Sequence, residues 1–343
     1  MRILIVYSVF LALVLAPPAR AQTSCDECRV RLVKVAELSS EKAPVPPSLA
    51  ATVAAANGHF YVTYLFQPPS ILKFSSAGEL AGYYDRQGEG PGELRSFAQV
   101  FVRNDTLLVW DAPRVHYFTP DLEPIETHLT DTRAVRIKSV PTHGLVGKVT
   151  SPTGAEVRVL RPGATTWVSL PLDPRLTDGG EPVFGPGDDG AWTAASNESR
   201  LAKVDIDGST IIALTPRRDW FLPWSGEVIG EPFTVRPRNQ VSDVGLLGGG
   251  RVLLASRVAD TNWSAMGEPG TEILFHPAKL DLSTIYDTVF EVISIQDGEV
   301  VARGRHDRAI TRVEGTSNLY FSPRSTEVGH VVIDVWRVEL SSR

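Results

Sequence analysis

The sequence predicts an all-β fold, a six-bladed β-propeller whose ring is closed by an N-terminal strand that joins the last blade. Short runs of Val, Leu, Ile, Phe and Tyr alternate with turn residues, and 28 Gly and 25 Pro are spread evenly along the 343 residues. Long stretches with the 3.6-residue period of a helix are few. A turn-and-strand unit also recurs at a spacing near that of one four-stranded blade.

The first two repeats define the unit. Phe74 and Phe118 occupy equivalent third strands and lie 44 residues apart, which matches the usual length of a blade. Four further units follow more loosely. The second strands of the six units contain Phe60, Leu107, Leu145, Trp192, Val252 and Leu319. In the fifth unit we expect the next strands at 278–280 and 289–293, and in the sixth at 331–338.

The two ends of the chain are expected to meet. The sixth unit has no fourth strand after Val338, whereas residues 29–35 form a near-alternating strand with no neighbour in the sequence. Pairing these two segments would close the ring and remove two exposed edges. The competing architecture is a β-sandwich, which would not explain the repeat period.

The N-terminus has the pattern of an export signal. Arg2 precedes an apolar run over 3–15, Pro17 and Pro18 interrupt it, and residues 19–21 read Ala-Arg-Ala. We expect cleavage after Ala21, a mature domain over 22–343, and a secreted or periplasmic protein. The alternatives are an uncleaved membrane anchor and a lipoprotein attached through Cys25, which lies well past the apolar run.

Charge excludes some classes of partner. Two of the 34 Lys and Arg residues lie in 1–21, so the mature chain carries 32 against 40 acidic residues, a net charge of −8. An acidic chain does not suit nucleic acid or an anionic membrane surface. No second apolar run is long enough to span a bilayer, and we expect a monomer that does not span the membrane.

The only cysteines are Cys25 and Cys28. A haem attachment would need His next, where Arg29 stands, and a zinc site would need more ligands than two sulfurs. A thioredoxin-like pair should precede a helix, and no helix signal follows. We therefore expect a small disulfide loop, formed in an oxidising compartment.

The segment Gly88–Leu94, with sequence Gly-Glu-Gly-Pro-Gly-Glu-Leu, is the most distinctive local feature. Three glycines around one proline favour a tight connection. Glu89 and Glu93 are candidates to bind a cation or a sugar hydroxyl. The alternative is a connection between blades in which the acids accept hydrogen bonds from free backbone N–H groups.

This segment, with the strands around it, resembles a family of exported bacterial six-bladed propellers. These proteins are similar in build to NHL-repeat and TolB-like propellers and mostly have no assigned activity. The resemblance covers residues 58–129, including the Leu-Val-Trp-Asp strand at 108–111 and the aromatic strand at 115–118. It implies the fold and export, and it carries over no catalytic residue.

Histidines raise the question of a metal. Metal-dependent lyases and lactonases of the NHL type place ligands from several blades around the axis. His59 and His143 begin equivalent second strands and His306 precedes the sixth unit, so these three are the metal-ligand candidates. No His-x-His or His-Glu-x-x-His pair supports them, and isolated histidines are commonly turn or surface residues. We expect no cofactor, with a divalent metal as the alternative.

Residues 216–240 interrupt the repeat. This stretch combines prolines with arginines and aromatic residues, a composition that suits contact with a protein, peptide or glycan. The binding candidates are Arg217, Arg218, Trp220 and Trp224. The alternative is an insertion that packs its aromatic side chains against the ring.

These observations lead to two hypotheses of function. The first is a non-enzymatic binding or scaffolding propeller that acts outside the cytoplasm on a protein, peptide or glycan partner. The second is a metal-dependent hydrolase or lyase of the lactonase or NHL type. The ring axis discriminates between them, because an enzyme should gather metal ligands from several blades at one mouth of the channel.

Overall fold

The computed structural model describes residues 28–43, 51–64, 69–95, 98–132, 134–140, 143–151, 154–177, 182–223, 235–265, 282–327 and 330–342. Within these ranges the chain is almost entirely β-structure. The described helices are single 3₁₀ turns at Ser40–Lys42, Pro174–Leu176 and Leu282–Thr284. None of the helices in these ranges has the length and apolar character needed to cross a membrane.

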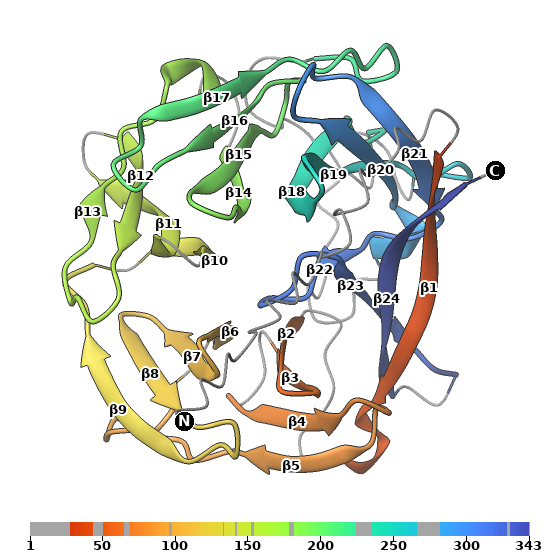
Figure 1. Ribbon diagram of the computed structural model, residues 1–343. Helices are drawn as coiled ribbons and strands as arrows, with labels where there is room; N and C mark the ends of the chain where they lie inside the picture. Colours follow the sequence, from red (N-terminus) through yellow and green to blue (C-terminus); the bar gives the residue numbers. More distant parts are fainter. Residues whose placement is uncertain are drawn as a thin grey trace, which may run out of the picture.

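Strands form sheets arranged in a ring around a central axis (Figure 1). Four of the sheets have four antiparallel strands each, in sequence order from the axis outward. The first contains β2 (Ala51–Ala56), β3 (His59–Tyr64), β4 (Ile71–Ser75) and β5 (Leu80–Tyr84), and the second β6 (Gln99–Arg103), β7 (Thr106–Asp111), β8 (Arg114–Phe118) and β9 (Pro124–Leu129). The third contains β10 (Val135–Val140), β11 (Gly144–Ser151), β12 (Gly154–Leu160) and β13 (Val168–Ser169), and the fourth β14 (Pro182–Pro186), β15 (Ala191–Ala195), β16 (Leu201–Val204) and β17 (Thr210–Leu214).

A fifth sheet has eight strands, where the sequence predicts two separate sheets of four. Its order is β18-β19-β20-β21-β1-β24-β23-β22. These strands are β18 (Gln240–Gly248), β19 (Arg251–Ala259), β20 (Tyr286–Ser294), β21 (Val300–His306), β1 (Cys28–Ser39), β24 (Val331–Ser342), β23 (Leu319–Ser325) and β22 (Thr311–Arg312). Among the described residues, the two halves pair where β1 runs parallel to β21, at Cys28–Ala302 and Arg29–Arg303.

The strand order within the fifth unit differs from the prediction. Val289–Ile293 belongs to β20, the third strand, and the fourth strand is β21. The predicted strand at 278–280 lies outside the described residues. Residues 287–293 are all buried, as expected of a central strand covered on both faces, and burial on both faces does not by itself reveal a strand's place in the sheet.

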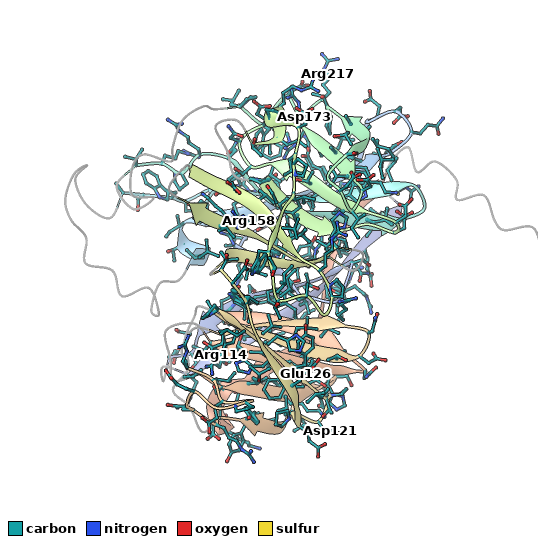
Figure 2. All side chains as sticks on the ribbon, turned by 90° about the vertical axis from the view of Figure 1, so that its left-hand side faces the viewer. Arg114, Asp121, Glu126, Arg158, Asp173 and Arg217 are labelled. Atoms are coloured by element: carbon teal, nitrogen blue, oxygen red, sulfur yellow. The ribbon has the colours of Figure 1, made fainter. Side chains whose placement is uncertain are left out.

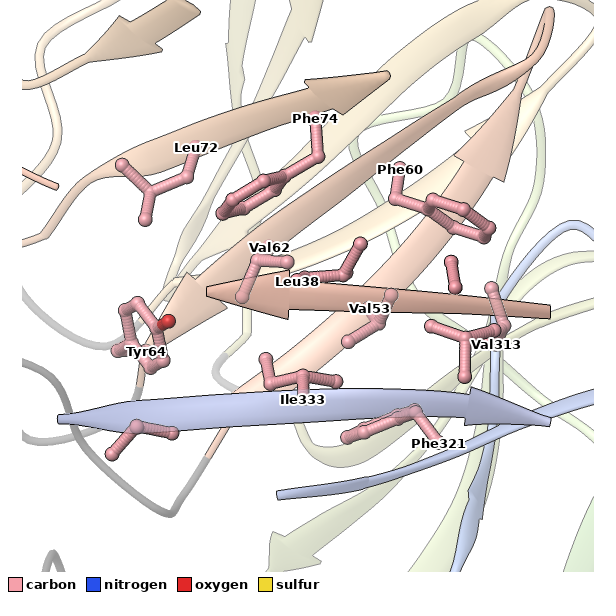
Figure 3. Packing of buried hydrophobic residues seen from close by; sticks show 13 residues of the cluster. Leu38, Val53, Phe60, Val62, Tyr64, Leu72, Phe74, Val313, Phe321 and Ile333 are labelled. Carbon is pink, nitrogen blue, oxygen red and sulfur yellow. The ribbon is translucent and has the colours of Figure 1, made fainter. Parts of the chain in front are cut away.

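The N-terminal strand pairs with the last strand, as predicted. β1 and β24 are antiparallel from Cys28–Ser342 to Ser39–Val332, with a bulge between Lys34 and Ala36. Leu38 is 1% exposed and lies with Val53, Phe60 and Ile333 in the cluster that packs this half of the large sheet against the first sheet (Figure 3). The strand is therefore part of the hydrophobic core.

We predict that deleting residues 22–39 from the mature protein removes most of its stability. Val30, Ala36 and Leu38 are buried, and the loss of these side chains together with one edge of β24 should cost on the order of 5 kcal/mol or more. The free energy of unfolding in urea measures the effect. A synthetic peptide of residues 28–39 should restore part of the loss.

Deletion of residues 341–343 is the control, because it removes only the end of the β1–β24 ladder. It should change the free energy of unfolding by less than about 1 kcal/mol. Equal stability of the 22–39 deletion and the intact mature protein would contradict closure of the ring by β1.

Candidate functional site

The two ends of the ring carry very different connections. In each sheet the first-to-second and third-to-fourth connections lie at one end, and the remaining connections lie at the other. At the first end, which we name the short-turn end, no connection exceeds seven residues. At the opposite, loop-bearing end, two connections run over 215–239 and 260–285. Figure 2 shows Arg114, which begins β8 directly after the connection 112–113, and Asp121, in the connection 119–123, toward opposite sides of the ring.

The innermost strands of the sheets surround two small cavities of about 180 Å³ each. Residues from β2, β6, β10 and β22 line one cavity, and residues from β10, β14 and β18 line the other. Lys138 of β10 borders both. Because all six inner strands contribute, the cavities lie along the axis of the ring. Loops and cavities at such an axis are where binding residues concentrate on a rigid scaffold.

The first cavity, which we name the Arg257 cavity, combines apolar and polar side chains. Its lining consists of Lys138, Pro182, Val183, Phe184, Ser196, Gln240, Val241, Ser242 and Arg257. Several of these residues begin strands β14 and β18 or end β19, which places the cavity toward the loop-bearing end. Lys138 forms an ion pair with Glu314, with Nζ 2.9 Å from Oε1.

Arg312 lines the second cavity and is held by a buried polar network. Its guanidinium donates to Asp243 Oδ2, with Nε at 2.8 Å, and Tyr320 donates to the same oxygen at 2.7 Å. Burial lowers the pKa of Arg312, but the charge of Asp243 outweighs it and the net shift is upward. Gly245 permits this arrangement, because a Cβ there would lie 2.2 Å from an Arg312 guanidinium nitrogen. Arg312 is therefore a structural cation whose charge is already compensated.

The predicted acids Glu89 and Glu93 do not converge on a ligand site. Glu93 folds back on its own loop and accepts a hydrogen bond from the Gly90 N–H at 2.8 Å. Gly88 lies against this carboxylate, at a φ of 153°, where a Cβ would collide with Oε2. The Glu89 side chain is 83% exposed and lies 3.6 Å from the Arg95 guanidinium. For Glu93 the structure agrees with the alternative reading, a connection whose acid caps backbone N–H groups.

Asp111 anchors the other side of this loop. Its Oδ2 accepts from the Arg95 N–H at 2.8 Å and from the Arg114 guanidinium at 2.5 Å, and the side chain is fully buried. Burial raises the pKa of Asp111, but interactions with His116, the Arg95 N–H and Arg114 outweigh it and lower the pKa to about 2. The charged carboxylate is thus part of what holds the glycine-rich loop in place.

The stretch after β17 is partly a core element. Arg218 is buried, and its Nε lies 2.5 Å from Glu291 Oε2 on β20. Trp220 donates from Nε1 to the other oxygen of Glu291 at 2.8 Å, and Phe221 is 2% exposed. Arg217 points to solvent with 85% of its side chain exposed, and Trp224 lies outside the described residues. Residues 218–221 therefore pack against the sheet, which agrees for them with the alternative of an insertion packed against the ring.

The three predicted metal-ligand histidines do not meet. His59 begins β3 and His143 directly precedes β11, both at the short-turn end, whereas His306 ends β21 at the loop-bearing end. The Nε2 of His143 contacts the Asp205 carbonyl oxygen at 2.6 Å, and burial lowers the pKa of this imidazole. The His306 ring packs on Trp336 with centroids 4.9 Å apart.

Within the described ranges, the one cluster of potential metal ligands is Asp260, Asp287 and Asp307. Arg305 already provides a counter-charge here, because its Nε donates to Asp287 Oδ2 at 2.7 Å. Asp260 accepts from the Asn262 N–H through Oδ1. Burial raises the pKa of Asp287. These contacts account for the cluster as part of the strand-end structure.

Cys28 begins β1 and is disulfide-bonded. Its predicted partner Cys25 lies outside the described residues, so the pairing stays a prediction. Lys138, Gln240 and Arg257, which line the Arg257 cavity, were not predicted from the sequence. The available signal was polar residues within otherwise apolar inner and second strands, such as Arg257 near the end of the run 251–259.

No family model and no curated protein matches the sequence. The fold does match solved structures. A member of the DUF4221 family from Bacteroides vulgatus superposes with a TM-score of 0.60 at 9% identity, over 93% of this chain and 100% of that chain. A Bacteroides fragilis protein named as an exported protein gives 0.52 at 8% identity, over 93% and 97%. At these identities the similarity shows the fold alone, and the resemblance to NHL and TolB propellers stays a prediction.

We predict that Arg218→Ala destabilises the protein by about 3–5 kcal/mol, because it removes one partner of a fully buried carboxylate. Arg217→Ala is the matched control, because Arg217 is adjacent to Arg218 in sequence but its side chain is exposed. This substitution should change the free energy of unfolding by less than about 0.5 kcal/mol. Urea unfolding of both variants measures the difference. Equal stabilities would show that the Glu291 network does not hold this segment.

We also predict an acid-dependent loss of stability from Asp111. Its pKa falls from 3.8 to about 2 on folding, so it stabilises the native state above the unfolded value, and this contribution disappears as the pH falls toward 2. The contribution at neutral pH is about 2 kcal/mol. The difference in unfolding free energy between wild type and Asp111→Asn should therefore shrink by that amount between pH 6 and 2.

Glu89→Gln is the control for this experiment, because its carboxylate is exposed in the same loop. Its unfolding free energy should follow the wild type within about 0.5 kcal/mol at each pH. A constant difference between wild type and Asp111→Asn across the pH range would refute the role of the charged carboxylate.

Proposed function

We propose that this protein is an exported six-bladed propeller that acts as a binding module for a protein or peptide, which it contacts at the loop-bearing end. In this proposal the eight-stranded sheet counts as two blades, because within the described ranges two residue pairs join its halves. Export rests on the N-terminal sequence 1–21. The observation that carries the function is the unequal distribution of connections, with the two longest at the end toward which the Arg257 cavity lies.

Exposed apolar side chains support a protein partner. Leu222 is 73% exposed and Val235 is 47% exposed, and both belong to the connection 215–239. The preceding residues 218–221 are fixed to β20 through Glu291, so Leu222 is presented from a structured turn. An apolar side chain held in solvent by a rigid support is typical of a contact residue.

Aromatic residues favour a peptide over a glycan. Sugar rings stack on exposed aromatic faces, and among the described residues no tryptophan is exposed. Trp110, Trp167 and Trp192 are in the core. Trp220 is fixed to Glu291, and Trp336 packs on His306. A glycan partner is therefore an alternative outcome of the binding experiment.

The hydrolase or lyase alternative is less well supported, because His59 and His143 lie at the opposite end from His306. Metal analysis of the purified mature protein discriminates between the two functions. One equivalent of a divalent metal that resists dialysis would favour the enzyme, and it would direct attention to the Asp260, Asp287 and Asp307 cluster.

The test selects binders from a random library of peptides with free C-termini on immobilised mature protein. A glycan array is screened with the same protein in parallel. Dissociation constants of the selected peptides are then measured for wild type and variants. Leu222→Glu and the cavity-filling Gln240→Trp should each weaken binding at least about tenfold, since both alter the loop-bearing end.

Ile206→Glu is the matched control. Ile206 is 43% exposed in the turn 205–209 at the short-turn end, and its substitution should leave the dissociation constants unchanged. Binding that is sensitive to Ile206→Glu and insensitive to both loop-end variants would overturn the assigned surface. Ligands found only on the glycan array would overturn the assigned class of partner.

A further inference from the structure

Arg257, which is partly buried on β19, differs from three other arginines that contact carboxylates of the large sheet. Arg218, Arg305 and Arg312 each form an ion pair with a carboxylate on β18 or β20. Within the described part of the chain, Arg257 has no carboxylate partner. Its Nη2 makes one long hydrogen bond of 3.4 Å to Thr311 Oγ1, and its buried Nε has no partner.

A guanidinium in this position is strongly disfavoured without a counter-charge. Burial lowers the pKa of Arg257, and an electrostatic interaction with the Tyr286 phenol acts in the opposite direction. An arginine stays protonated even so, because its ordinary pKa is far above neutrality. The positive charge therefore remains, and a bound anion would satisfy both the charge and the free Nε–H.

The charge count of the cavity selects the kind of anion. Lys138 is the other described cation in the lining, and its charge is compensated by Glu314 at 2.9 Å. Among the described residues, one positive charge is left without a carboxylate partner, which matches a carboxylate ligand, whereas a phosphate group carries close to two negative charges at neutral pH. The planar guanidinium also fits a carboxylate in a bidentate arrangement.

The volume and lining of the cavity select the size of the group. About 180 Å³ is comparable to a cavity that holds one benzene ring, so it takes one residue-sized group and no more. Pro182, Val183 and Phe184 provide an apolar wall, and Gln240 and Ser242 provide polar groups near the guanidinium.

We infer that the Arg257 cavity is a subsite for a ligand carboxylate attached to a compact apolar group. This inference rests on the proposed function and specifies its chemistry, because the C-terminal residue of a peptide combines these two features. A free organic acid or an acidic sugar would present the same carboxylate, and the test separates these sources.

The test measures binding of small probes to the mature protein by ligand-observed NMR at constant ionic strength. The probes are N-acetyl-L-phenylalanine, its C-terminal amide, benzoate and glucuronate. We expect N-acetyl-L-phenylalanine to bind at least about tenfold more tightly than its amide. Arg257→Gln should abolish this preference, and Arg257→Lys should retain part of it.

Arg217→Gln is the control for general electrostatic attraction, because Arg217 is exposed in the connection 215–239 at the loop-bearing end, toward which the cavity lies. It should leave the preference for the carboxylate unchanged. If benzoate binds as tightly as N-acetyl-L-phenylalanine, the source is a free acid, and if only glucuronate binds, the source is a sugar. Both results support the carboxylate subsite and reject the peptide terminus.

Equal binding of the acid and the amide to wild type would overturn the inference, as would an undiminished preference in Arg257→Gln. The first result does not depend on the stability of Arg257→Gln, because it uses the wild type alone, and an undiminished preference in the variant would itself show that the variant is folded. Peptides selected on the loop-bearing end that bind equally as acids and amides would refute the subsite while leaving the proposed function intact.

Discussion

The pairing of β1 with β24 is the constraint on which the rest of the structure depends. An antiparallel array that grows outward from an axis leaves its last sheet incomplete unless the other end of the chain supplies a strand. Here β1 supplies it along the whole of β24 and, at its first residues, also pairs with β21. The halves of the large sheet are therefore connected through a segment distant in sequence from both of them.

The inner side of the same region is closed by a second backbone contact. The Ala55 N–H donates to the Glu314 carbonyl oxygen at 2.9 Å, and the Glu314 N–H donates to Val53 at 2.8 Å. Gly315 is required beside this bridge, with a φ of 82°, because a Cβ would lie 2.8 Å from the Ala55 oxygen. Glu314 is thus fixed through its backbone while its side chain compensates Lys138 in the cavities. Ring geometry and cavity electrostatics depend on the same residue.

Buried ion pairs are concentrated in the half of the large sheet that carries the longest connections. Asp243, Asp287 and Glu291 each receive an arginine from another segment. Such pairs add little net stability over a hydrophobic equivalent, but removal of one partner is costly. These ion pairs suit a region in which the ends of long connections must be held at defined positions on the sheet. A wrong pairing of the segments would leave a buried charge without its partner. Arg257 is the exception to this pattern.

Features that depend on residues close together in the sequence could be predicted, and features that depend on distant residues could not. The repeat and the strand that completes the large sheet could be predicted, because turn residues and alternation act over a few neighbours. The order of strands in the fifth unit could not, since β20 is buried on both faces and 26 residues separate it from β19. The Arg257 cavity could not be predicted either, because the ring alone brings Lys138 of the inner strand β10 close to Arg257 of the second strand β19. Glu93 and Arg218 were identified as notable, but their roles depend on Gly90 and Glu291, which the motif alone does not indicate.

The size of the cavity limits what it can contribute to affinity. A hydrogen bond to a charged group contributes about 1.5–3 kcal/mol, and burying one apolar side chain contributes about as much again. Their sum corresponds to a dissociation constant near the millimolar range, once the cost of immobilising the ligand is included. A partner that binds in the micromolar range must therefore gain the remainder from surfaces outside the cavity. Leu222 is part of such a surface in the proposed function, because residues 218–221 fix it to the same sheet that carries Arg257. In this arrangement the cavity determines which chemical end of the ligand enters, and the loop-bearing end determines how tightly the whole partner is held.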